Sequence, residues 1–247
     1  GPEGRAGMTI IASVKVRDGI VLATDSMTQI TSRAENGQTK PIKAYSNARK
    51  LFQIGDLPIG VMSCGIGNIG SRSIESLVLE FSHRFDKSVE QPWSVEIVAR
   101  GLFSFVEGVY DEAFQEVRDE QRRKGLPIMG FFVSGYSPDA PFAEEWEFVL
   151  PHDTEIHRVR QSEICGTSWR GITLPFERLY NGFDRRLVDT LKEVGVADEI
   201  LRKVFNVEKW RMPISYDGMP VQDAINFAVY ILETTIGAAT FEVGLAA

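Results

Sequence analysis

Histidine and cysteine are scarce in this chain of 247 residues, which contains three of the first and two of the second. The cysteines, Cys64 and Cys165, follow none of the spacings of metal-binding cysteines, and three histidines limit both histidine-based catalysis and histidine-rich metal sites. We therefore expect no metal and no cofactor. A reduced cytoplasmic protein is a simpler interpretation than a disulfide between the two cysteines, although the sequence leaves both open.

Long apolar runs and an excess of basic charge are also missing. No apolar segment stands out as long enough to span a bilayer, and no basic segment leads into an apolar one as in a secretory signal. The formal net charge of −7 argues against nucleic acid as the main partner. We therefore expect a globular protein that binds neither membrane nor nucleic acid. Its 43% of hydrophobic and 25% of charged residues agree with this class.

The first eight residues are expected to lie outside the fold. Residues 1–7 show no periodicity, and the leading Gly-Pro resembles the remnant of a cleaved tag. We interpret residues 1–8 as a tag remnant or a pro-segment. The remaining residues, 9–247, contain no repeat, no low-complexity segment and no linker, so we expect one domain there.

Apolar periodicity predicts strands and helices in separate blocks. Residues 9–17 alternate between two faces, and Asp18-Gly19 is a hairpin turn that leads to a return strand at 20–25. Residues 27–47 are interpreted as an extended loop. Segregated blocks favour an α+β fold with two sheets, each covered by a pair of helices. The further elements are strands at 50–53, 59–63, 127–135, 144–150, 154–160, 162–166 and 239–247, and helices at 74–85, 95–122, 173–194 and after Pro220.

Thr9 is a candidate nucleophile because it opens the first strand directly after Met8. Methionine is commonly removed ahead of a small second residue, and its removal would expose the amine of Thr9. A free α-amine titrates near pH ~7.7–8.0 and accepts a hydroxyl proton at neutral pH, so an N-terminal threonine combines nucleophile and base. This chemistry requires that the amine is free.

Two charged residues and a glycine-rich turn are expected to accompany Thr9. Asp25 ends the return strand of the hairpin, and strand pairing brings that end back near Thr9. Lys50 opens the next strand, where a neighbouring carboxylate would hold it charged and oriented. The turn at 62–68, Met-Ser-Cys-Gly-Ile-Gly-Asn, leads into a helix and exposes N–H groups, as an oxyanion hole requires. Each feature alone is weak evidence, since most lysines are surface residues.

With these residues, the chain resembles the β-type subunits of the proteasome superfamily, the N-terminal-threonine branch of the N-terminal-nucleophile (Ntn) hydrolases. Thr9, Gly19 and Asp25 match the opening hairpin of that family without a gap, and Lys50 in Arg-Lys-Leu-Phe matches its catalytic lysine. The longer loop before Lys50 and the added residues at 195–215 separate the chain from typical eukaryotic and archaeal subunits, so it resembles a divergent bacterial relative of the HslV-like or Anbu-like branches more closely. The resemblance implies a four-layer αββα sandwich, with two antiparallel sheets between helix pairs.

The resemblance also implies a function, which is peptide hydrolysis by a threonine endopeptidase. It implies peptides or unfolded proteins as substrates and a homo-oligomeric ring or barrel, and it leaves a regulatory ATPase open as a partner. The run at 165–168, Cys-Gly-Thr-Ser, is similar to the Gly-Ser-Gly turn of the family. The residues that the resemblance assigns are Thr9, Asp25, Lys50 and Thr167 for catalysis, Cys64 or Gly65 for the oxyanion hole, and Thr28, Met62 and Ile66 for the substrate pocket.

The chain departs from the family near the end of the last helix. Residues 234–240 read Thr-Thr-Ile-Gly-Ala-Ala-Thr, so the second aspartate of the family is absent, and Thr240 takes the place of the serine that follows it. Two alternatives therefore stay open. One is a non-catalytic subunit of the same fold that retains the residues before Thr9. The other is an Ntn amidase or transpeptidase that acts on a small substrate.

Overall fold

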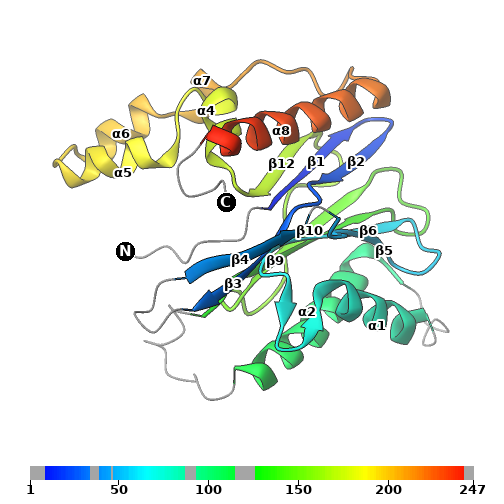
Figure 1. The fold of residues 1–247 in the computed structure, drawn as a ribbon. Helices are drawn as coiled ribbons and strands as arrows, with labels where there is room; N and C mark the ends of the chain where they lie inside the picture. The colour runs from blue at the N-terminus through cyan, green and yellow to red at the C-terminus, as the bar shows by residue number, and fades with distance from the viewer. Residues whose placement is uncertain (1–8, 34–38, 46, 87–92, 115–125, 242–247) are drawn as a thin grey trace.

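The computed structural model describes residues 9–33, 39–45, 47–86, 93–114 and 126–241. Figure 1 shows two sheets at the centre, with helices on the two outer sides. The α+β class predicted from the sequence is confirmed, because strands and helices follow one another in blocks and every strand pair in the described part of the chain is antiparallel.

The smaller central sheet has three strands in the order β12 (Gly166–Gly171), β1 (Ile10–Val16) and β2 (Gly19–Thr24). One face of β1 carries apolar side chains at every second position, as a half-buried strand requires. These side chains pack in a core cluster with α4 (Leu174–Asn181) and α8 (Val221–Phe241), which cover this sheet in Figure 1. The members of the cluster from β1 are Ala12, Val14 and Val16.

The larger sheet has five strands, and two helices cover its outer face in Figure 1. Its core cluster joins strand residues such as Phe148 to helix residues such as Phe103, whose ring meets that of Phe148 edge to face at 5.2 Å. The strands, in sheet order, are β11 (His157–Arg158), β10 (Glu144–Leu150), β9 (Met129–Gly135), β6 (Ile59–Gly65) and β5 (Leu51–Gln53), and the helices are α1 (Ile74–Asp86) and α2 (Val95–Ala113).

The inner faces of the two sheets meet in a small apolar cluster. Ile11 of β1, Met62 of β6 and Phe132 of β9 are almost fully buried in it. The helices thus bury the outer faces of the sheets, and the strands bury their inner faces against one another. Thr9 lies at one end of this interface, since it directly precedes β1.

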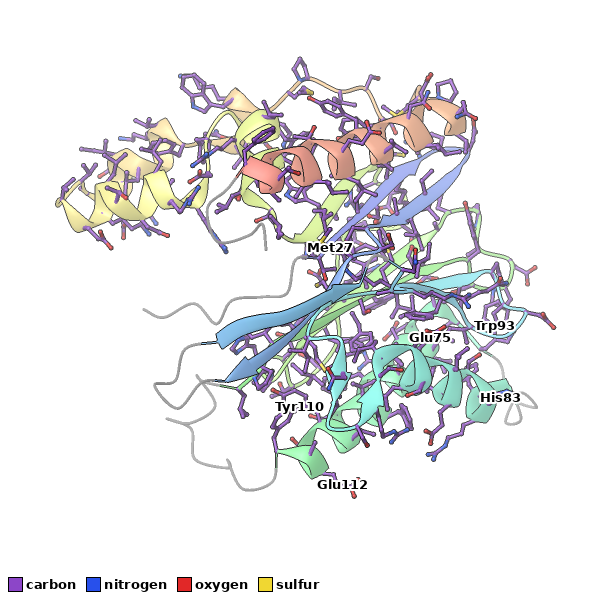
Figure 2. All side chains as sticks on the ribbon, in the orientation of Figure 1. Met27, Glu75, His83, Trp93, Tyr110 and Glu112 are labelled. Atoms are coloured by element: carbon purple, nitrogen blue, oxygen red, sulfur yellow. The ribbon has the colours of Figure 1, made fainter. Side chains whose placement is uncertain are left out.

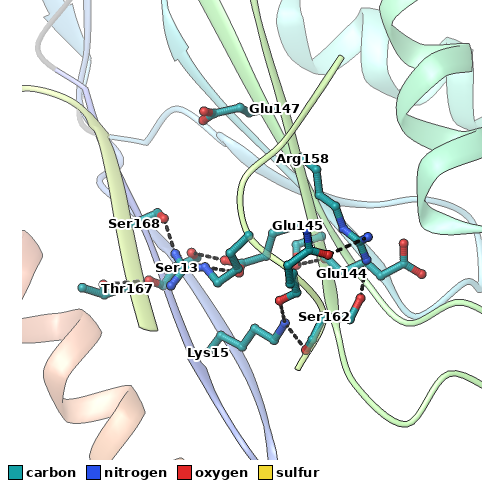
Figure 3. A network of polar contacts seen from close by, with 12 residues as sticks. Ser13, Lys15, Glu144, Glu145, Glu147, Arg158, Ser162, Thr167 and Ser168 are labelled. Atoms are coloured by element: carbon teal, nitrogen blue, oxygen red, sulfur yellow. Dashed lines mark hydrogen bonds and ion pairs between the residues drawn. The ribbon is translucent and has the colours of Figure 1, made fainter. Parts of the chain in front are cut away.

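A buried polar cluster lies farther along β1 on the same inner face (Figure 3). Ser13 Oγ donates to Glu145 Oε1 at 2.7 Å, and Lys15 Nζ donates to the Ser162 carbonyl at 2.6 Å. Glu145 Oε2 and Arg160 Nε are 2.6 Å apart, an ion-pair contact without hydrogen-bond geometry. Burial raises the pKa of Glu145 and lowers that of Lys15, because both lose hydration. The cluster attaches the segment around β11 to the inner faces of both sheets.

The segment expected to be a loop at 27–47 forms two strands instead. β3 (Thr28–Arg33) and β4 (Thr39–Tyr45) pair as a two-stranded antiparallel sheet. The polar composition suggested a loop, but threonine and isoleucine favour strands, and pairing satisfies their backbone groups. Two further short strands, β7 (Asn68–Ile69) and β8 (Arg72–Ser73), precede α1.

The helix predicted at 173–194 is interrupted. α4 ends at Gly182, whose φ of +76° is left-handed, and α5 (Arg185–Glu193) begins after Asp184, whose side chain accepts from two N–H groups of its first turn. The added residues that follow form α6 (Asp198–Val204) and α7 (Val207–Trp210), which were not predicted. In Figure 1, α5 and α6 extend away from the central sheets.

Several predicted boundaries differ from those observed. The strand expected at 162–166 is β12, which begins only at Gly166, and that expected at 154–160 is reduced to β11. The predicted strand at 239–247 is wrong for residues 239–241, which continue α8, and its remainder lies outside the described residues. The helix expected at 95–122 ends at Ala113, and most of the remainder also lies outside them.

The helix α8 corrects the expectation about apolar runs. It has 21 residues, and an 18-residue window within it has a mean hydropathy of 1.3, so by length and composition alone it is long and apolar enough to cross a bilayer. A core helix passes the same test, and one such helix is weak evidence for a membrane span. Ala224, Ala228 and Ile231 of this helix pack in the core cluster that also contains β1. The packing explains part of its apolar character.

Candidate functional site

Thr9 lies at the open end of the hairpin, where β1 and β12 meet. It is only 4% exposed, and its carbonyl accepts a hydrogen bond from the N–H of Ile172 at 2.8 Å. The neighbouring Gly171, opposite Ile10 in the register, has a φ of +91°. A Cβ at that position would lie 1.9 Å from the Thr9 carbonyl oxygen. Residues 171 and 172 thus hold the backbone of Thr9 from the side of β12.

The contact predicts a large effect for Gly171→Ala. We expect its free energy of unfolding to fall by about 1–3 kcal/mol from the strained backbone, and further from the collision with Thr9. Gly195→Ala is a matched control, because Gly195 has the same φ of +91° but open space around its Cβ position. Both variants share the backbone strain, and only Gly171→Ala adds the collision with Thr9. Urea denaturation of both variants therefore separates the two contributions to the loss of stability. Equal losses of stability would contradict the collision.

Asp25 is positioned by the hairpin and by backbone donors. The register places Thr24 opposite Ile11, and the Asp25 N–H donates to the Ile10 carbonyl at 3.1 Å. Its carboxylate accepts from two N–H groups, that of Ile10 at 3.0 Å and that of Met27 at 2.9 Å. Because both oxygens are held, the carboxylate has a fixed direction beside Thr9.

Lys50 completes the group from the other sheet, since it directly precedes β5. Its Nζ donates to Thr9 Oγ1 at 2.9 Å and contacts both Asp25 oxygens at 3.0 and 2.9 Å. It also donates to the Met27 carbonyl. The structure therefore brings together Thr9, Asp25 and Lys50, three residues that the sequence assigned to one site. All three are buried at the junction of the two sheets.

The electrostatics of the site centre on the ammonium group of Lys50. Burial lowers its pKa, and the charge and the hydrogen bond of Asp25 oppose that effect, with a net lowering. An ammonium group with a lowered pKa, 2.9 Å from a threonine hydroxyl oxygen, stabilises negative charge at that oxygen. The arrangement suits the activation of Thr9 as a nucleophile.

A cavity of about 190 Å³ opens beside this group. Thr9 and Lys50 line one part of it, and the glycine-rich turn lines another. Both residues expected in the oxyanion hole, Cys64 and Gly65, are among the lining residues. The flanking N–H groups are occupied, because Ser63 donates to the Lys50 carbonyl and Ile66 to the Ile128 carbonyl, both at 3.1 Å. Cys64 lies opposite Gly130 and two residues before Ile66, so its N–H also points to β9, whereas the N–H of Gly65 points to the same side as that of Ser63 and is the candidate donor.

Cys64 has a thiol that is not suited to nucleophilic attack. The residue is partly exposed, but its Sγ points at Gly130, where a Cβ would lie 3.0 Å from the sulfur. Burial raises the pKa of this thiol to about 11, so it stays neutral at physiological pH. The contribution of Cys64 to the cavity is therefore its backbone.

Of the two expected pocket residues whose side chains the structure describes, Ile66 lines the cavity. Met62 is fully buried between the sheets with Ile11 and Phe132, so its assignment to the pocket is wrong. Thr28 pairs with Tyr45 in the β3–β4 sheet, and its side chain lies outside the described part of the structure. Successive residues of β6 face opposite sides, which is why Met62 turns to the core.

Thr167 does not belong to this site, and its assignment to catalysis is wrong. It lies opposite Val14 in the register, and its Oγ1 donates to the Ser13 carbonyl at 2.8 Å. At about 3.3 Å per residue, this position is roughly 17 Å along the strand from Thr9. The residues beside Thr9 are Gly171 and Ile172, which the sequence interpretation missed. The glycine that ends β12, three residues before the proline-containing start of α4, was the available signal.

Thr240 also lies in an ordinary structural position. It is on α8, exposed to solvent, and its Oγ1 donates to the Ile236 carbonyl one turn earlier at 2.9 Å. Within the described residues, no group of three His, Cys, Asp or Glu side chains that could hold a metal ion is found.

Comparisons with known proteins give a distant structural likeness. No protein-family model matches the chain, and no curated protein matches it. Among solved structures, it is similar to a chain of the helical assembly of the Anbu complex from Pseudomonas aeruginosa, at 12% identity and a TM-score of 0.48. The match covers 93% of this chain and 75% of that chain. A likeness this distant says nothing by itself about activity, substrate or assembly.

Proposed function

We propose that this protein is a threonine peptidase of the N-terminal-nucleophile type, with Thr9 as the nucleophile. The observation that carries the proposal is the contact of Lys50 Nζ with Thr9 Oγ1 at 2.9 Å, while Asp25 holds the same ammonium group at 2.9 Å. The four successive layers, helices, sheet, sheet and helices, support an αββα sandwich formed by one domain at 9–247. The resemblance of the first sixty residues to the proteasome superfamily supports the proposed peptidase as well.

The proposed reaction begins with acyl transfer to Thr9. Its Oγ bonds to the scissile carbonyl carbon, and the hydroxyl proton passes to its own α-amine, directly or through a water. The C–N bond then breaks, the leaving nitrogen takes that proton, and an ester remains on Thr9. The charge of Lys50 favours the neutral amine, because a neighbouring cation lowers the pKa of an amine.

Water completes the cycle. It adds to the ester carbonyl and gives a proton to the Thr9 amine, after which the acid leaves and Thr9 Oγ recovers its proton. In both steps a negative oxygen forms on the carbonyl carbon. The N–H group of Gly65, at the wall of the cavity, is the donor we assign to it.

The proposal extends to assembly and substrate. We propose peptides or unfolded proteins as substrates and a homo-oligomeric ring or barrel in the cytoplasm, with a regulatory ATPase as a further candidate partner. Exposed apolar side chains on the α5–α6 extension support association, since Leu187, Val194 and Ile200 are 48%, 71% and 54% exposed.

The state of the N-terminus provides the test. We expect a chain that begins at Thr9 to hydrolyse peptides, and a chain that keeps residues 1–8 to be inactive, because a peptide bond removes the basicity of the amine. Fluorogenic peptides measure turnover. The intact mass after reaction with a small acylating ester measures the adduct, and this probe does not depend on access for a large substrate.

The outcomes separate the alternatives. An adduct on Thr9 with cleavage of small amides alone indicates an amidase or transpeptidase. The absence of any adduct when Thr9 is the first residue indicates a non-catalytic subunit. Equal activity with and without residues 1–8 would contradict the mechanism, since only a free amine can serve as the base.

A further inference from the structure

The cavity beside Thr9 contains a carboxylate that the proposed catalytic mechanism does not use. Glu75 lies in the first turn of α1 (Figure 2), and it lines the same cavity as Thr9 and Lys50. It is partly buried. A carboxylate in the first turn of a helix is ordinary in itself, because it interacts favourably with the helix dipole. The helix dipole does not explain why this carboxylate lines the cavity beside Thr9.

Among the described residues, the two basic side chains that line the cavity, Arg49 and Lys50, are both engaged away from Glu75. Lys50 is paired with Asp25, and the Nε of Arg49 donates to the Leu51 carbonyl at 3.2 Å. The guanidinium of Arg49 also lies over the ring of Phe52, 5.6 Å from its centre.

The basic residues closest to Glu75 in sequence are engaged elsewhere. Arg72 of β8 and Arg84 of α1 both pair with Glu80, which lies farther along α1 than Glu75. Within the described ranges, no ion pair or hydrogen bond of the Glu75 side chain is found. A cation that entered the cavity would therefore meet an unpaired carboxylate.

The size and the wall of the cavity indicate what that cation is. Pockets that bury a whole small-molecule ligand measure about 300–1,000 Å³. The volume here, about 190 Å³, is closer to that of one amino-acid side chain. Two aliphatic residues, Ile66 and Ile74, line it together with the glycine-rich turn and Glu75. An aliphatic wall with a carboxylate fits a long apolar stem with a charged tip, as in lysine and arginine.

We propose that Glu75 is a specificity-determining residue, which selects substrates with a lysine or arginine as the residue that supplies the scissile carbonyl. The inference rests on the proposed function of Thr9, and it names the substrate class of that site. The cationic side chain enters the cavity, its stem packs on Ile66 and Ile74, and its tip pairs with Glu75. The carbonyl of the same residue then lies at Thr9.

The test compares two peptides that differ only in charge, one with arginine and one with its neutral isostere citrulline ahead of a fluorogenic amide. For the chain that begins at Thr9, we expect kcat/KM to be roughly tenfold higher with arginine, as for a paired and partly desolvated charge. Glu75→Gln should bring the ratio close to one, and Glu75→Lys should invert it.

Glu96→Gln is the matched control. Glu96 occupies the same second position of α2 that Glu75 occupies in α1, and it is not among the residues that line the cavity, so the substitution alters the charge at a helix start outside the cavity wall. For Glu96→Gln, the ratio of kcat/KM between the arginine and citrulline peptides should equal that of the unaltered protein. An unchanged ratio in Glu75→Gln, or an equal drop in Glu96→Gln, overturns the inference.

A binding measurement separates this inference from the proposed function. Calorimetry with Thr9→Ala measures the affinity of the same two peptides without turnover, and we expect the arginine peptide to bind roughly tenfold more tightly. Equal affinities overturn the role of Glu75. Tighter binding of arginine, together with no hydrolysis by the chain that begins at Thr9, supports the role of Glu75 in binding and overturns only the catalytic proposal.

Discussion

Thr9→Ala is expected to lower kcat for peptide hydrolysis at least ~10⁴-fold, because it removes the only atom that the mechanism bonds to the substrate. The fold should change little. Thr9 directly precedes β1, and Lys50 keeps its contacts with Asp25 and the Met27 carbonyl when the hydroxyl is lost. We expect the free energy of unfolding to stay within about 1 kcal/mol. Turnover of a fluorogenic peptide and urea denaturation measure the two effects.

Thr9→Ser is the matched control for this experiment. It keeps the hydroxyl and the amine and loses one methyl group, so we expect measurable hydrolysis and an ester adduct on residue 9. All three proteins must begin at residue 9 for the comparison. Hydrolysis by Thr9→Ala at the rate of the unaltered protein would show that another group carries the reaction.

Loss of either partner of the Lys50–Asp25 pair is expected to affect both activity and stability. The side chains are 9% and 5% exposed, so each single substitution leaves a buried group without its partner. We expect Lys50→Met and Asp25→Asn each to lower the free energy of unfolding by about 3–5 kcal/mol. The rate of hydrolysis should fall by about 10²–10³, as for the loss of one electrostatic contact to the reacting oxygen.

The double variant Lys50→Met/Asp25→Asn separates the two roles. With both charges gone, no unpaired charge of this pair stays buried, so the loss of stability should be smaller than the sum of the single losses. Activity should not recover. Recovery of activity together with stability would mean that the pair only supports the fold.

The pH dependence of hydrolysis tests the same pair. The carboxylate of Asp25 raises the pKa of Lys50 against the effect of burial, so Asp25→Asn should lower that pKa further. The alkaline limb of the plot of kcat/KM against pH is then expected to move to lower pH. Movement to higher pH would show that Asp25 does not act on Lys50 electrostatically.

Local signals determined the parts of the fold that the sequence predicted well. The hairpin at 9–25 follows from alternation and from Asp18-Gly19, and strand pairing alone then brings Asp25 back to Thr9. The apolar periodicity of α1 and the apolar run of β9 are also signals carried by residues close together in the sequence. Where turns were less distinct, prediction failed, as at 27–47 and at the break between α4 and α5 at Gly182.

The site depended on relations that no local pattern contains. Lys50 belongs to the other sheet, and it was predicted from family resemblance rather than from spacing. The register between β1 and β12 decided that Gly171 and Ile172 lie beside Thr9, whereas Thr167 lies farther along the strand. A shift of a few residues in an antiparallel pair changes which side chain reaches the end of the sheet, and composition carries little information about register.

The sequence by itself determined the α+β class and the opening hairpin that brings Asp25 back to Thr9, because strand period and turn chemistry act over a few residues. Only the tertiary structure decided which residues share the cavity. It turned Met62 into the core and brought Glu75, from the first turn of a helix, to the wall beside Thr9. These outcomes depend on how two sheets and a helix pack, and packing is set by contacts between segments far apart in the chain.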